Sequence, residues 1–162
     1  MSLLGFTHVI LLLISDFYSE VPAGCFVASD DVNSFTMLEK AYFYLSAGTS
    51  TQAPVSNEQR NDLSRINDLL RHSHMSALKQ IILDCAITYK STLDLLLLFS
   101  EMDLILAGGT QENLPVLRSV TILVDCSQRY KYKVIGMIMK RMPLLRKMGI
   151  VKVIRGEDRQ LL

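Results

Sequence analysis

The segment from residue 119 to residue 156 reads SVTILVDCSQRYKYKVIGMIMKRMPLLRKMGIVKVIRG, and its three parts differ in composition. The first part, SVTILVDC, is rich in β-branched residues, and the last part, GIVKVIRG, alternates side chains between two glycines. Both patterns are typical of strands. The stretch between them, residues 129–147, is long enough for a crossover helix. The order strand, basic helix, strand therefore predicts a C-terminal βαβ-like unit.

Outward from this unit, apolar residues recur mostly at helical spacing. The spacing predicts three helices, over residues 31–47, 56–71 and 75–106. The third is so apolar around Leu93 that it is expected to lie in the core, with a break near Ser91 or Ser100. The apolar run from His8 to Ser15 is expected to add a strand at the start of the fold.

The sequence therefore predicts an α/β fold, a helix-rich single domain with a small sheet. The alternative is an all-α bundle in which residues 113–148 form two helices. A chain of 162 residues is long enough to be one domain, 1–162, without a metal or a disulfide to hold it together. No apolar run reaches the length of a membrane-spanning helix, which is about 20 residues.

The N-terminal residues 1–23 have a second interpretation, a cleaved secretory signal. The apolar run is long enough, and Val21-Pro22-Ala23 offers a cleavage site. Against a signal, no Lys or Arg precedes the run, and Asp16 and Glu20 follow it. Three widely spaced cysteines form neither a disulfide framework nor a zinc pattern, which favours an intracellular location; secretion is the alternative.

Charge is distributed unevenly along the chain. The net charge is +1, but residues 1–117 carry −7 and residues 118–162 carry +8. Such an asymmetry predicts an anionic partner for the basic part, although the two parts can also face each other in one fold or dimer.

The basic segment separates into two faces when it is drawn as a helix with about 100° per residue. One face carries four cations: Arg129, Lys133, Lys140 and Lys147. The opposite face carries five apolar residues: Val134, Ile135, Ile138, Met142 and Leu145. Pro143 is expected to kink the helix or end it early. The apolar face predicts packing on the core, and the cations are the candidate partner-binding residues.

These observations favour a non-enzymatic protein-interaction module whose basic helix contacts an acidic protein surface or a second copy of the chain. An anionic membrane surface is a further candidate partner. Nucleic acid is disfavoured, because Tyr130 and Tyr132 lie at the helix start rather than beside the whole row of charges. The alternative is a secreted small helical signalling or effector protein, formed after removal of the signal.

No catalytic, cofactor or metal site is predicted, and the sequence leans against an enzyme without deciding the question. His72 and His74 lack further ligands at zinc spacing. Cys126 is the one candidate nucleophile, because Arg129 and a helix N-terminus would lower the pKa of its thiol.

Overall fold

The computed structural model describes residues 9–13, 38–45, 55–109 and 113–161 of the chain. They contain a sheet of five parallel strands, in the order β1-β2-β3-β4-β5. The strands are β1 (Val9–Leu13), β2 (Lys40–Leu45), β3 (Gln80–Ala86), β4 (Ser119–Asp125) and β5 (Val151–Arg155). The order in space is thus the order in sequence. The predicted α/β class is confirmed, and the parallel sheet excludes the all-α bundle.

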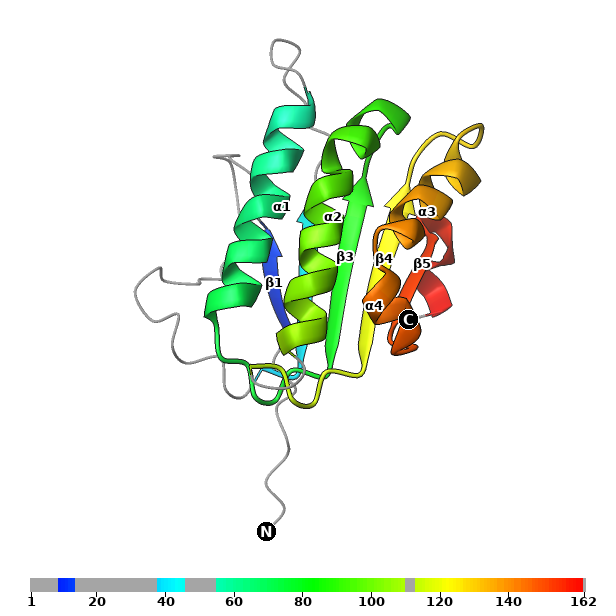
Figure 1. Cartoon of the computed structure of the whole chain (residues 1–162). Helices are drawn as coiled ribbons and strands as arrows, with labels where there is room; N and C mark the ends of the chain where they lie inside the picture. Colours follow the sequence, from blue (N-terminus) through cyan, green and yellow to red (C-terminus); the bar gives the residue numbers. More distant parts are fainter. Residues whose placement is uncertain (1–8, 14–37, 46–54, 110–112, 162) are drawn as a thin grey trace.

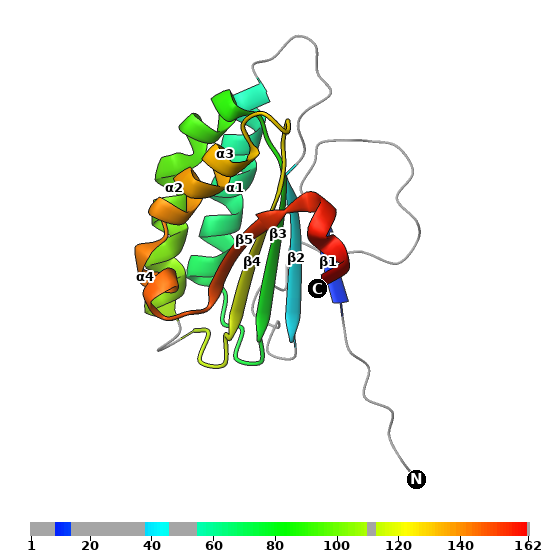
Figure 2. The same cartoon turned by 90° about the vertical axis from the view of Figure 1, so that its right-hand side faces the viewer.

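Helices fill the connections that follow β2, β3 and β4. They are α1 (Val55–His72), α2 (Tyr89–Gly109), α3 (Lys131–Lys140) and α4 (Pro143–Lys147), and a 3₁₀ helix, η2 (Gly156–Leu161), follows β5. Figure 1 shows the strands side by side behind the helices, and Figure 2 shows α1 to α4 on one side of the sheet. Sequential strands joined by crossovers of one hand place every crossover helix on the same face.

The core lies between this face of the sheet and the helices. Alternate strand residues point into it: Ala41, Phe43, Leu45, Ile81, Leu83, Cys85, Val120, Ile122 and Val124. Helix α2 contributes Leu95, Phe99, Met102 and Leu106, all buried. Each such side chain stabilises the fold by about 1.5–3 kcal/mol relative to exposure.

The helix predicted over residues 31–47 is wrong where the structure describes it, because Lys40–Leu45 is strand β2. Burial alternates along the strand, with Ala41, Phe43 and Leu45 inside. Leu38, Tyr42 and Leu45 satisfy helical spacing, but that pattern leaves Phe43 unexplained. Two Tyr and a Phe in six residues also suit a pleated strand better than a helix. Residues 31–37 and 46–47 lie outside the described part.

The helix predicted over residues 75–106 is also wrong in its first half. Gln80–Ala86 forms the central strand β3, and only from Tyr89 does the chain become helical. A central parallel strand is buried on both faces, so its continuous apolar run resembles a buried helix in sequence. The helix starts at a reciprocal cap. The Thr88 amide donates to Ser91 Oγ at 2.9 Å, and the Ser91 amide donates to Thr88 Oγ1 at 3.1 Å.

The basic segment forms two helices rather than one. Helix α3 ends at Lys140, and α4 begins at Pro143, which occupies the first turn, where a missing N–H costs least. Strand β5 then pairs with β4 in parallel register, from Val120 opposite Val151 to Val124 opposite Arg155.

Asp103 of α2 connects α4 to the body of the domain. Its carboxylate accepts the amide of Leu144 at 3.0 Å and the amide of Leu145 at 2.9 Å. Asp103 is only 2% exposed, so a buried acidic group caps the N-terminus of α4 from a neighbouring helix.

Candidate interaction surface

The four predicted partner-binding cations are all exposed. Arg129 lies in the turn before α3, Lys133 in the first turn of α3, Lys140 at its last position and Lys147 at the last position of α4. The break at residues 141–142 divides the row into two groups. The first group adjoins the start of α2, and the second lies where α3 ends and along α4.

In the first group, two cations cover two stacked tyrosines. The rings of Tyr89 and Tyr130 lie 5.1 Å apart with 25° between their planes. Lys133 Nζ is 4.7 Å from the centre of the Tyr89 ring, and Arg129 lies 5.4 Å from that of Tyr130. An interaction with the Tyr89 side chain is the main cause that raises the pKa of Lys133. These ring faces are already occupied within the protein, which weakens the case for base stacking there.

The second group gathers cations that the sequence had placed on different faces. Lys140 and Lys147 are joined by Arg141 and Arg146, and these four residues are here called the α3–α4 basic surface. None of the four has a carboxylate of a described residue within ion-pair distance. Within the described part of the chain, no ion pair therefore neutralises their charge.

The opposite face of α3 and α4 packs on the core as predicted. Val134, Ile138, Met142 and Leu145 are fully buried, and Ile135 is half-buried. Two apolar side chains remain beside the basic surface, Leu144 at 39% and Met148 at 45% exposure. The surface thus combines exposed cations with exposed apolar side chains.

Lys131 differs from the other cations, because it is buried and pairs with Glu157 Oε1 at 2.9 Å. Sequence analysis missed this ion pair. Its signal was present, since Lys131 falls on the apolar side of the helical projection. Glu157 also lies 3.6 Å from Arg155, and Asp158 pairs with Arg155 at 2.8 Å. Both carboxylates of η2 are therefore paired with cations of the neighbouring elements α3 and β5.

Helix α2 is less buried than its composition predicts. Leu97 is 73% exposed, Leu104 is 65% exposed and Leu93 is also exposed. These leucines lie on the outer side of the helix, whose inner side carries Phe99 and Leu106. The prediction that the segment from Leu93 lies in the core therefore holds for its inner side, with Leu95 and Phe99, and not for its outer side.

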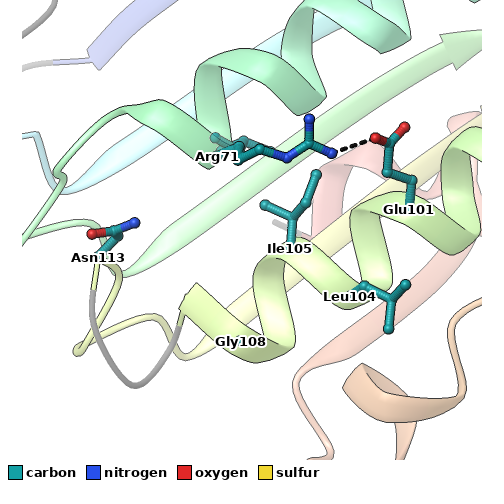
Figure 3. Close-up of a pocket in the computed structure, with 7 residues that line it drawn as sticks. Arg71, Glu101, Leu104, Ile105, Gly108 and Asn113 are labelled. Atoms are coloured by element: carbon teal, nitrogen blue, oxygen red, sulfur yellow. Dashed lines mark hydrogen bonds and ion pairs between the residues drawn. The ribbon is translucent and has the colours of Figure 1, made fainter.

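A hollow of about 530 Å³ lies between α1 and α2 (Figure 3). Arg71 and Glu101 form an ion pair across it, and Leu104, Ile105 and Asn113 contribute to its lining. The paired charges leave no net attraction for a charged ligand. It is an open depression rather than an enclosed site.

The structure gives the other candidate residues no catalytic geometry. Burial is the main cause that raises the pKa of the Cys126 thiol, with Asp125 adding to it and Lys131 opposing it. This direction is opposite to the lowered pKa that would activate the thiol. His72 and His74 are exposed, and the described residues contain no group of three or more His, Cys, Asp or Glu placed to hold a metal.

Comparison with protein-family models, with curated proteins and with solved structures gives no match. Within the described ranges, no helix combines the length and the apolar character needed to cross a membrane.

Proposed function

We propose that this chain is a non-enzymatic protein-interaction module that binds an acidic partner through the α3–α4 basic surface. The observation that carries the proposal is the set of four exposed cations with no ion-pair partner among the described residues. In this proposal, β4, α3, α4 and β5 act as a βαβ-like unit that presents these cations on a rigid base.

The apolar residues beside the cations favour a protein over a small anion as the partner. Leu144 and Met148 are exposed next to Arg146 and Lys147. Apolar contacts supply affinity at the centre of an interface, and charges at its rim supply steering and register. Methionine also adapts to partners of different shape. An anionic membrane surface would use the same cations and is the weaker candidate.

Most acidic groups of the described part are paired or buried, and the exposed carboxylates without an ion pair there, Asp94 and Asp125, lie on different elements. Glu39 pairs with Lys79 at 2.7 Å, and Asp68 and Glu101 both pair with Arg71. Asp84 and Asp103 are buried. Charge complementarity therefore favours a different, acidic protein over self-association through these residues.

The test is a charge reversal with a matched control. We expect Lys140→Glu/Lys147→Glu to weaken binding of acidic proteins about tenfold or more, because each exposed ion pair contributes ~0.2–1 kcal/mol and reversal adds repulsion. Arg60→Glu/Lys90→Glu makes the same change in net charge on exposed residues of α1 and α2, and is expected to retain binding. The measurement is quantitative affinity capture at low and high salt.

Three outcomes would contradict the proposal. Equal loss of capture in both double variants would show that net charge, not the α3–α4 basic surface, governs binding, and undiminished capture by Lys140→Glu/Lys147→Glu would show that the surface is not needed. Capture that does not weaken with added salt would exclude an electrostatic contact.

The secreted signalling protein stays a separate prediction, and its helical-bundle form is excluded by the sheet. Cleavage after Ala23 would remove β1, whose five residues pair with β2. N-terminal sequencing of the protein isolated from cells distinguishes a start at Gly24 from an intact start. The intracellular location rests on cysteine usage and is tested by the same measurement.

A further inference from the structure

The segments that lead into successive strands resemble one another, and each strand with the segment before it is here called a layer. In the register of the sheet, Leu38, Leu78 and Leu117 occupy equivalent positions just before β2, β3 and β4, and all three are buried. The turns before β3 and β4 are alike: the amide of Leu78 donates to Met75 and that of Leu117 to Leu114, both at 3.1 Å. A repeated unit of this kind buries its apolar residues against the next layer.

The last layer carries the same pattern, and among the described residues no layer follows it. The pairing of Val120 with Val151 makes Met148 the equivalent of Leu117, and Leu145 the equivalent of Leu114. Leu145 is buried like its equivalents, but Met148 is 45% exposed. The apolar position that a following layer would cover is therefore open.

Strand β5 is also the edge of the sheet. The amide of Val120 donates to the carbonyl of Ile150 at 2.7 Å, which fixes the direction of the backbone groups. In a parallel ladder, alternate residues bond to the same neighbour. Lys152 and Ile154 therefore bond to β4, and the N–H and C=O groups of Val151 and Val153 point away from the sheet. Such an edge accepts a further strand.

The charges near this edge select an acidic strand over a second copy. Lys152 is exposed, and it has no carboxylate of a described residue within ion-pair distance. The side chains of Val151 and Val153 face the core, so strand alternation places Lys152 on the face of the sheet opposite α3 and α4. The edge therefore has a cation on that face and the α3–α4 basic surface on the helix-covered face. Two copies paired edge to edge would bring both sets of cations together, and like charges at close range oppose association.

We propose that an extended acidic segment of a partner protein adds to β5 as a sixth strand, covering Met148 and pairing its carboxylates with the adjacent cations. This inference rests on the proposed function, because it specifies how the acidic partner is held. The backbone of Val151 and Val153 supplies the strand pairing, and the cations supply the preference for acid.

The test uses the full chain and a synthetic seven-residue peptide of alternating glutamate and valine, blocked at both ends. Binding is measured by fluorescence anisotropy, and amide exchange of β5 is followed by NMR with and without the peptide. We expect the peptide to slow exchange at Val151 and Val153, whereas Lys152 and Ile154 are slow in both states. An N-methylated peptide that cannot pair through its backbone is expected to bind about fivefold or more weakly, as expected when at least one hydrogen bond is lost.

Val153→Pro is the matched variant in the protein, because the N–H that it removes points away from β4. It also replaces a half-buried side chain, so the integrity of the sheet is checked in the same experiment. It is expected to weaken peptide binding by a similar factor, with the slow exchange of Lys152 retained as evidence that the sheet is intact. The N-methylated peptide makes the same test on the unaltered chain.

The outcomes separate this inference from the function on which it rests. If Lys140→Glu/Lys147→Glu abolishes binding but N-methylation has no effect, the acidic partner stands and strand addition is overturned. If exchange at Val151 and Val153 slows equally in that charge-reversed variant, strand addition stands and the basic surface is not the acid receptor. No binding, or unchanged exchange at both valines, overturns the inference.

Discussion

Replacing Asp103 is expected to release α4 from the rest of the domain. The carboxylate lies on α2, but its two hydrogen bonds go to the amides of Leu144 and Leu145, 41 and 42 residues along the chain. Asp103→Ala would leave both amides without this acceptor, and Leu145 is fully buried. Helix α4 is only five residues long, so it has little stability of its own.

The size of the effect follows from these two bonds. A hydrogen bond to a charged group contributes about 1.5–3 kcal/mol, and loss of a helix N-cap costs about 0.5–2 kcal/mol. Because the two bonds share one carboxylate, we expect Asp103→Ala to lower the free energy of unfolding by about 3 kcal/mol. Asp103→Asn keeps a neutral acceptor and should lose about half as much.

Urea unfolding measures this free energy, and the melting temperature gives an independent check. A loss of ~3 kcal/mol corresponds to a decrease of about 6–12 °C for a domain of this size. Asp94→Ala is the matched control, because Asp94 is an exposed carboxylate on the same helix, and its replacement should change stability by less than about 0.5 kcal/mol. Equal losses in Asp103→Ala and Asp94→Ala would refute the reasoning.

Two further predictions concern α3 and its surroundings. Gly136 is helical with nothing within 4 Å of an added Cβ, whereas Gly149 has a φ of 72°. Gly136→Ala should therefore raise the unfolding free energy and Gly149→Ala should lower it, each by about 1 kcal/mol; urea unfolding showing the same sign for both would contradict this. Tyr89→Phe should lower the pKa of Lys133 towards the ordinary lysine value of 10.5, because the hydroxyl is lost. A lysine whose pKa is raised in the folded state stabilises the fold at pH values below the unfolded-state pKa of about 10.5, and this contribution is lost as the pH rises through the folded-state pKa. Any stability difference between wild type and variant should therefore shrink above about pH 10.5. NMR titration of the Lys133 side chain would oppose the assignment if its pKa did not move.

The sequence predicted correctly those elements whose residue pattern is typical of a strand or of a helix, but not of both. SVTILVDC and GIVKVIRG contain β4 and β5, because β-branched residues between turn signals suit strands and little else. The helix from residue 56 to 71 is α1 within one residue at each end. In these segments the residue pattern favours one type of secondary structure, and the structure has that type.

The errors arose where tertiary packing decided between two local patterns. QIILDCA in β3 is apolar at nearly every position, so only its two neighbouring strands identify it as a strand. LDLLLLF in α2 is equally apolar, yet Leu93 and Leu97 are exposed. Composition could not tell a strand covered on both faces from a helix covered on one.

For the candidate interaction surface, the sequence indicated which cations are exposed but not how they are arranged. Arg129, Lys133, Lys140 and Lys147 are exposed, as the projection indicated. The projection assumed one continuous helix, so it separated Arg141 and Arg146 from Lys140 and Lys147. Pro143 gave the signal for the break, but the new direction of α4 depends on Asp103, which lies on another helix.

The charge asymmetry of the chain is not cancelled within the described part of the fold. Most acidic groups there are paired or buried, and no described carboxylate lies within ion-pair distance of the cations at the end of α3 and on α4. The carboxylate of Asp103 contacts α4, and it accepts the backbone amides of Leu144 and Leu145. The hydrogen bonds from Asp103 thus hold α4 in place through its backbone and do not use the side chains of Arg146 and Lys147. A buried carboxylate therefore positions the basic surface, while the cations of that surface are exposed to solvent.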